Sequence, residues 1–322
     1  MLFQPPAGPE PLLTWEQPIR ELIGFLASFC ALGAVGFRNA VLAPLLRRAE
    51  SATPLAATLD HVASRAAGIG LVGSALGVGA LAAGVIHTAT AKHLGVSAVV
   101  HRGGAMMLFQ MTALAVMLIF FALARNRRPP PVAWPVATIA TIALALRQVV
   151  TLKWTAIVNP LHVAAASLWI GTLFVVVVAG LTVILGAAMP KELRGRVVVD
   201  LIGGFSPLAL AAAGLLVITG VTTAVRHLKY LSALWTTPYG YTFIAKLGAV
   251  AVVVVLGAWN WKRVKPRLGD ESAAVAIRRS AIRELAVAGV VLLITAVLVS
   301  LPSPRLPSAQ RPIAPGTIGA PR

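Results

Sequence analysis

The sequence predicts an all-α protein, a polytopic membrane helix bundle of about eight transmembrane helices with both termini outside. Composition indicates this class, because hydrophobic residues make up 58% of the 322 residues and charged residues 12%, against roughly 45–50% and 25% in soluble domains. The apolar residues gather in stretches near or above the roughly 20 residues that cross a bilayer as a helix. Since lipid offers backbone groups no hydrogen-bond partners, such stretches favour helices.

Eight apolar stretches follow one another along the chain. They cover residues 18–44, 67–87, 104–124, 132–151, 160–188, 199–225, 239–261 and 280–301. The fourth has a short core because Pro135 and Arg147 flank it, and its loss would leave an odd number of spans. We predict four regions: an external segment (1–17), an N-terminal four-helix half (18–158), a C-terminal four-helix half (159–301) and a disordered, proline-rich tail (302–322).

Basic residues predict the orientation of these helices. The net charge is +18, and the connections after the first, third, fifth and seventh stretches hold sixteen Lys and Arg, against six in the other three. Because cytoplasmic loops carry the excess of Lys and Arg, both termini are predicted to face outward. A basic excess of this kind indicates topology and contact with the lipid bilayer, not nucleic acid. With no basic region before the first stretch, no cleaved signal peptide is expected.

Two polar residues of the first stretch are functional candidates. Cys30 lies near mid-depth and, as the only cysteine, cannot form an intramolecular disulfide; a small core residue is the competing interpretation. Glu21 lies just inside the outer end and is a candidate ion-pair partner for Lys246. Lys246 lies about 12 Å into the seventh stretch, with Arg147 at a similar depth as a competitor. An intramembrane charge is a functional candidate, and a snorkelling lysine is the competing interpretation.

The second and third stretches bring histidines and methionines to the outer end. His87 closes a stripe of small residues that begins at Gly73, and such stripes permit close helix approach, so His87 is predicted to point into the bundle. His93 and His101 follow in the connection to the third stretch. Three methionines lie in the outer half of the third stretch: Met106, Met107 and Met111. Adaptable core packing is the competing interpretation for each methionine.

The fifth and sixth stretches each place a histidine near the outer end. An Asn-Pro pair at 159–160 is typical of a helix N-cap and first position, which puts His162 in the first turn, on one stripe with Trp169. His227 closes the sixth stretch. Together with His87, these two histidines are predicted to converge. A histidine satisfied within a helix interface is the competing interpretation for each one.

The ligand types at this outer end favour copper. Thioethers are soft ligands that suit Cu⁺, and imidazole accepts copper in either oxidation state, whereas a hard cation would want carboxylate oxygens, in which the outer end is poor. The alternative is a membrane electron-transfer protein in which pairs of histidines ligate b-type haem. Histidines gathered at one end of the bundle favour copper over haem. A protein that carries electrons across the bilayer would need histidine ligands near both membrane surfaces. A purely structural assembly factor is a third interpretation.

A route inward for copper needs ligands below the outer end. A bare charge is too costly to cross hydrocarbon without them. Met111, Met117 and Cys30 lie roughly 10, 20 and 18 Å deep at 1.5 Å per residue. They are predicted to form a ladder of sulfurs, provided that the first and third helices are neighbours.

Two motifs of the second half occur together. The first is His-x6-Trp-x-Gly, at His162, Trp169 and Gly171, and the second is Thr-Pro-Tyr-Gly…Lys, from Thr237 to Lys246. With the apolar stretches around them, residues 160–301 resemble the bacterial copper resistance D (CopD) family of inner-membrane proteins. The resemblance implies a multi-pass protein of the bacterial inner membrane that moves copper from the periplasm across it. It also implies a separate periplasmic copper-binding partner, because no such domain is fused here.

Motifs of catalysis are missing from the sequence. It contains no arrangement that resembles a hydrolytic triad, a phosphate loop or a nucleotide fingerprint. We therefore expect that the protein is not an enzyme.

Overall fold

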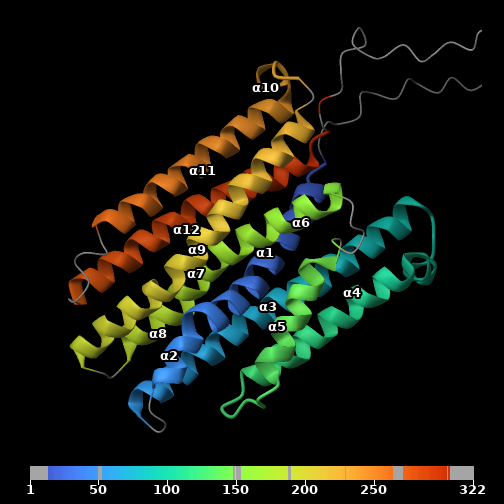
Figure 1. Cartoon of the computed structure of the whole chain (residues 1–322). Helices are drawn as coiled ribbons and strands as arrows, with labels where there is room; N and C mark the ends of the chain where they lie inside the picture. The colour runs from blue at the N-terminus through green and yellow to red at the C-terminus, as the bar shows by residue number, and fades with distance from the viewer. Residues whose placement is uncertain are drawn as a thin grey trace, which may run out of the picture.

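The described part of the chain is helical, which confirms the predicted all-α polytopic bundle. The structure, a computed structural model, describes residues 14–49, 53–147, 149, 154–187, 190–228, 230–263, 271–302 and 304, and these residues contain no strand. Most of the predicted external segment and nearly all of the predicted tail lie outside them. Figure 1 shows the long helices running side by side in one bundle.

The helices form long rods, two of which contain π-helical turns. Their bounds are α1 (Glu16–Gly36), α2 (Ala43–Arg48), α3 (Pro54–Ala91), α4 (Val96–Ala124), α5 (Ala133–Ala145), α6 (Trp154–Ala166), α7 (Thr172–Val175), α8 (Thr182–Gly186), α9 (Lys191–His227), α10 (Ala233–Thr236), α11 (Pro238–Arg263) and α12 (Glu271–Ser300). The π-helical turns join α1 to α2 (Phe37–Leu42), α6 to α7 (Ser167–Gly171) and α7 to α8 (Val176–Leu181). Helices α1–α2 and α6–α8 are therefore each one continuous rod.

Seven helices of the described chain are long and apolar enough to cross a membrane, one fewer than the eight predicted. The fourth stretch forms α5, whose 13 residues give about 20 Å, less than the roughly 30 Å of the hydrocarbon core. After α5, Arg147 turns back and donates to Leu144 O at 2.8 Å, where the last carbonyls lack helical partners. Although α5 is short, α6 begins at the opposite end of the bundle from the start of α5. As a result, α1 begins and α12 ends at the same end (Figure 1).

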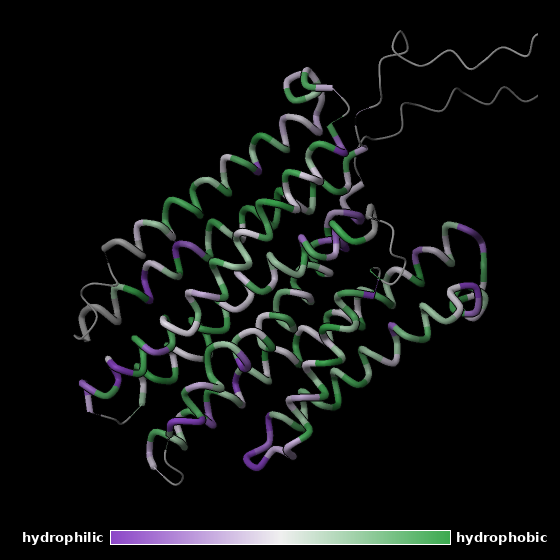
Figure 2. Tube along the Cα trace, in the orientation of Figure 1, coloured by the Kyte–Doolittle hydropathy of each residue, from purple (hydrophilic) through white to green (hydrophobic). Residues whose placement is uncertain are grey.

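Polar residues gather at the two ends of the bundle (Figure 2). The connections α2–α3, α4–α5 and α8–α9 lie at one end, named the basic end for Arg48, Arg128 and Lys191. The connections α3–α4 and α9–α10 lie at the other, named the histidine end for His101 and His227. The separation of basic loops from histidines is the one that the sequence predicts.

Helix α1 holds the bundle together. It packs against α3 and α5 on one side, and against α12 and the π-helical turn Ser167–Gly171 on the other. The closest approach joins Gly33 to Gly171, where a Cβ added to Gly171 would lie 3.2 Å from the Gly33 Cα. Backbones can approach this closely only without side chains between them. The approach fixes the α6–α8 rod, which carries His162, against the first helix.

Candidate functional site

His162 lies on α6, where this helix packs against α9. The predicted N-cap just before it is wrong, because α6 begins at Trp154 and Pro160 lies inside the helix. In a membrane the chain gains from keeping its backbone hydrogen bonds within a helix, so α6 extends through the proline. His162 is therefore in the third turn of α6 instead of the first, and it is half-buried.

A single hydrogen bond to α9 orients the His162 ring. Its Nδ1 lies 2.9 Å from Thr219 Oγ1, and Thr219 donates its one hydroxyl hydrogen to Leu215 O at 2.7 Å. Because that hydrogen is committed, the network assigns the imidazole proton to Nδ1, which donates to Thr219 and leaves the lone pair on Nε2. Gly220 makes room for the ring, since a Cβ there would lie 3.3 Å from His162 Cε1. His162 is thus held as a lone-pair donor.

Lys246 on α11 is an electrostatic neighbour of His162. It is half-buried, and it makes no ion pair with Glu21 or with any other carboxylate of the described residues. A groove of about 550 Å³, lined by Leu22 of α1 and Ala245 of α11, separates the two helices at this level. The predicted pairing of Glu21 with Lys246 is therefore not formed, and the lysine charge acts on His162 instead.

The Thr-Pro-Tyr-Gly motif begins α11 and places Tyr239 against His227. Thr237 caps the helix, because its Oγ1 accepts a hydrogen bond of 3.0 Å from Gly240 N. A Cβ on Gly240 would overlap the backbone of α10, so glycine lets the two helices meet here. The Tyr239 ring stacks on His227 with centroids 6.3 Å apart and an angle of 9° between the planes. The motif therefore works as a support for one histidine.

His227 and His162 lie at two different depths of the C-terminal half. The Nδ1 of His227 lies 2.9 Å from Thr223 O, and a carbonyl can only accept, so the neutral ring carries its lone pair on Nε2. Thr219, which holds His162, precedes His227 by eight residues on α9. At 1.5 Å per residue this offset is about 12 Å. His227 thus lies nearer the histidine end and His162 deeper in the bundle, and each imidazole has an available Nε2.

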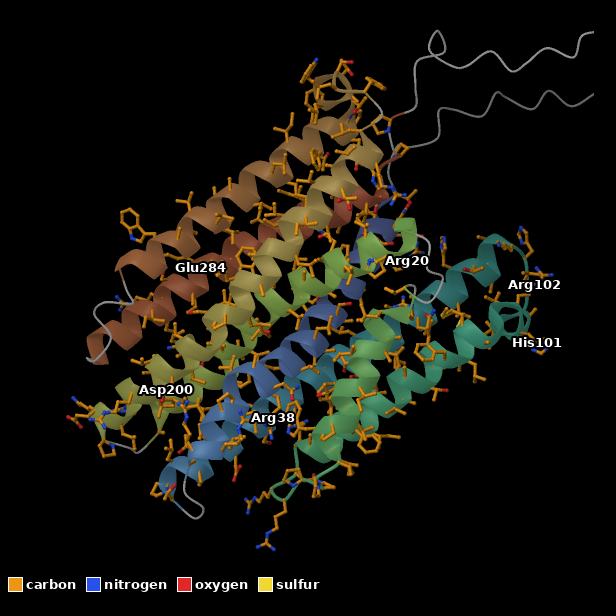
Figure 3. The ribbon with its side chains drawn as sticks, viewed as in Figure 1. Arg20, Arg38, His101, Arg102, Asp200 and Glu284 are labelled. Atoms are coloured by element: carbon orange, nitrogen blue, oxygen red, sulfur yellow. The ribbon has the colours of Figure 1, made fainter. Side chains whose placement is uncertain are left out.

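The remaining predicted histidines are exposed near the α3–α4 connection. They are His87, His93 and His101, and Figure 3 shows His101 at the histidine end. The prediction that His87 points inward is wrong: the inward stripe of α3 continues from Gly84 to Thr88, which is closer to the stripe in helical angle. Within the described residues no three His, Cys, Asp or Glu side chains gather as a metal site. The predicted convergence of three histidines is therefore not found.

The predicted methionines divide between two surfaces of α4. Met106 and Met111 are 42% and 45% exposed. Met107 and the predicted deeper ligand Met117 instead line a cavity between α1, α3, α4 and α5. The four sulfurs therefore do not form one ligand set.

The predicted ladder of sulfurs is not assembled in the described structure. Helix α3 packs against both α1 and α4, which face each other across this cavity instead of packing directly together. Cys30 packs on α3, where a Cβ added to Gly73 would lie 2.8 Å from the Cys30 Cβ, and it does not line the cavity that Met117 faces. Met111, the upper rung, is exposed.

Two supports of the histidines were not recognised in the sequence. Thr219 holds His162, and Tyr239 stacks on His227. Thr219, Thr223 and His227 recur at spacings of four on α9, and this periodicity could have indicated a common face. Trp169, the remaining predicted residue, lies half-buried in the π-helical turn, and its ring stacks on no described aromatic side chain.

Comparison with known proteins supports the resemblance noted in the sequence. Residues 199–298 match the family described as Copper resistance protein D. The resemblance to the CopD family is confirmed. The copper transport protein CutJ of Bacillus subtilis (strain 168) is 29% identical over 153 residues, which are 47% of this chain and 26% of CutJ. The match thus spans about a quarter of the length of CutJ, and no solved structure matches the chain significantly.

The CopD match covers only some of the residues around His162 and His227. Thr219, His227, Tyr239 and Lys246 lie inside residues 199–298, whereas His162 lies before them on α6. The hydrogen bond between His162 and Thr219 joins the two parts.

Proposed function

We propose that this protein is a copper-handling membrane protein that receives copper ions at the histidine end and passes them toward the basic end. One observation carries the proposal: His227 and His162 each keep an Nε2 lone pair available at successive depths, because His227 lies about 12 Å along α9 from the Thr219 that holds His162. Imidazole is a good ligand for copper in either oxidation state. The CopD match and the similarity to CutJ supply the choice of metal.

The arrangement suits passage of an ion better than its storage. Each level offers one imidazole whose Nδ1–H donates to an oxygen, and a hydrogen bond of this kind orients histidine ligands of metals. The charge of Lys246 acts on His162 and would oppose a cation bound there, which favours movement of the ion to the next site. A second ligand at His227 comes from outside the chain, and a separate periplasmic copper-binding protein is the donor we propose.

The proposed orientation places the histidine end in the periplasm and the basic end in the cytoplasm of a bacterial inner membrane. Reporter fusions after Arg128 and Arg267 should therefore read cytoplasmic, and fusions after Lys92 and Pro302 periplasmic, because Lys and Arg favour cytoplasmic loops. A cytoplasmic reading after Pro302 would put the histidines on the inner side. Uptake from the periplasm would then be excluded.

Metal content and the optical spectrum of the purified protein test the proposal directly. We expect a protein without a Soret band that binds copper in equilibrium dialysis, and less copper bound by His162→Ala. A Soret band would support the alternative, b-type haem bound by histidine pairs. His162 and His227 do not favour that alternative, because the two axial ligands of one haem iron lie closer together than the offset of about 12 Å along α9 between His227 and the Thr219 that holds His162.

A further inference from the structure

A second site lies in the N-terminal half, outside the CopD match. A cavity of about 460 Å³, named the arginine cavity, opens between α1, α3, α4 and α5. It extends from Arg20 to Leu32 along α1, about 18 Å at 1.5 Å per residue. Its volume lies in the range of small-molecule sites, roughly 300–1,000 Å³. A long and narrow cavity of this size accommodates one extended chain.

Hydrogen-bond donors without partners line the upper part of the arginine cavity. They are Arg20 of α1 and Gln110 of α4, together with Arg147 after α5, which has a partner for only one of its donors. Arg147 uses one guanidinium N–H on Leu144 O, and the side chains of Arg20 and Gln110 make no hydrogen bond within the described residues. A guanidinium carries five donors and stays charged, so leaving it half-buried without an acceptor is costly. Figure 3 shows Arg20 near the start of α1, toward the histidine end.

The surrounding chain provides no negative charge for these arginines. The sequence has no acidic residue between Asp60 and Glu192, so α4, α5 and their connections contain none. Glu16 and Glu21 of α1 make no ion pair with Arg20 or with any other described cation. An anion from outside these helices therefore completes the arginine pair.

The lower part of the arginine cavity is apolar. It is lined by Gly73 and Gly77 of α3 and by Leu114 and Met117 of α4. The hydroxyls at this level offer no donors, because groups such as Thr141 donate to their own helix, here to Ala137 O at 2.7 Å. Charged donors thus stand above a narrow hydrocarbon-lined space, which matches an amphiphile with an anionic head.

We propose that the arginine cavity binds one anionic phospholipid of the surrounding bilayer, with its phosphate between Arg20 and Arg147 and one acyl chain in the lower part. Guanidinium groups bind phosphate oxygens through paired, charge-assisted hydrogen bonds. A small inorganic anion would leave the apolar part empty, and a zwitterionic lipid would bring a cationic ammonium group close to the two arginines. The site is independent of the copper proposal, because it uses none of the same residues.

Binding of phosphatidylglycerol to the purified full-length protein, measured by native mass spectrometry, tests the head-group contacts. The Arg20→Gln, Arg147→Gln double variant should bind this lipid about tenfold more weakly or worse, since it loses both charges but keeps polar side chains. Arg102→Gln is the matched control: Arg102 is exposed at the histidine end and does not line the cavity (Figure 3). Its affinity should equal that of the unmodified protein.

A second pair of variants tests the cavity without changing charge. Gly84 lines the cavity and a Cβ there meets nothing within 4 Å, so Gly84→Leu should fold and occupy the space of the lipid. Gly79→Leu on the same helix has an equally open position outside the cavity and should bind normally. Unchanged phosphatidylglycerol binding in both the arginine and Gly84 variants would overturn the proposal. So would equal binding of phosphatidylcholine, or equal thermal protection by inorganic phosphate, which would indicate a site for a free anion.

Discussion

Replacement of His162 by alanine is expected to lower copper uptake by cells by about tenfold or more, the scale on which loss of a ligand or its orienting partner weakens metal sites. His162 presents an oriented Nε2 lone pair, and no second histidine lies at the same level on α9 to replace it. Uptake is measured as cell-associated copper after a short pulse, normalised to the amount of protein in the membrane.

His61→Ala is the matched control for this experiment. His61 is exposed on α3 near the basic end, whereas the proposed entry site is at the histidine end. Its replacement should therefore leave uptake unchanged. Thr219→Val should reproduce part of the loss, because valine keeps the volume but removes the oxygen that accepts from His162 Nδ1. Equal uptake by His162→Ala and His61→Ala would remove His162 from the proposed route.

The helices and their alternating directions were predictable, because a lipid bilayer constrains the length and the polarity of every segment that crosses it. Apolar length sets each span, and basic residues mark alternate connections, so the separation of the histidine end from the basic end follows from the sequence alone. The short α5 was the exception. Its apolar stretch runs on past Ala145, but the helix ends there and Arg147 donates to the carbonyl of Leu144.

The orientation of individual side chains was less predictable, because it depends on small angles and on neighbours. From Gly84, His87 lies about 60° to one side of the inward stripe and Thr88 about 40° to the other, at 100° per residue; the structure selects Thr88. The sulfur ladder failed for another reason. It required α1 and α4 to pack directly together, and sequence periodicity does not say that a cavity separates them.

The supports of the histidines could be predicted only in part. The Thr-Pro-Tyr-Gly motif was noticed as a pattern, yet its physical role, a capped helix start that stacks Tyr239 on His227, appears only when α9 and α11 are placed together. Thr219 was missed because a threonine within an apolar helix ordinarily bonds its own backbone, as it also does here.

Gly171→Ala is expected to destabilise the protein by about 3 kcal/mol or more, because overpacking against backbone cannot be relieved by moving a side chain. A Cβ on Gly171 would overlap Phe29 O and lie 3.2 Å from the Gly33 Cα. The clash falls between α1 and the π-helical turn that follows His162. In detergent, the apparent melting temperature should fall by about 5 °C or more.

Gly186→Ala is the control for this prediction, since a Cβ there meets nothing within 4 Å, and alanine in a helix should be neutral or mildly stabilising. Gly33→Ala should be as harmful as Gly171→Ala, because it obstructs the same contact from α1, where a Cβ would lie 2.8 Å from the Gly171 Cα. Once either alanine has separated the helices, the second costs little, so the double variant should lose less stability than the sum of the two. A melting temperature in Gly171→Ala equal to that of Gly186→Ala would show that α1 does not hold the His162 rod through this contact.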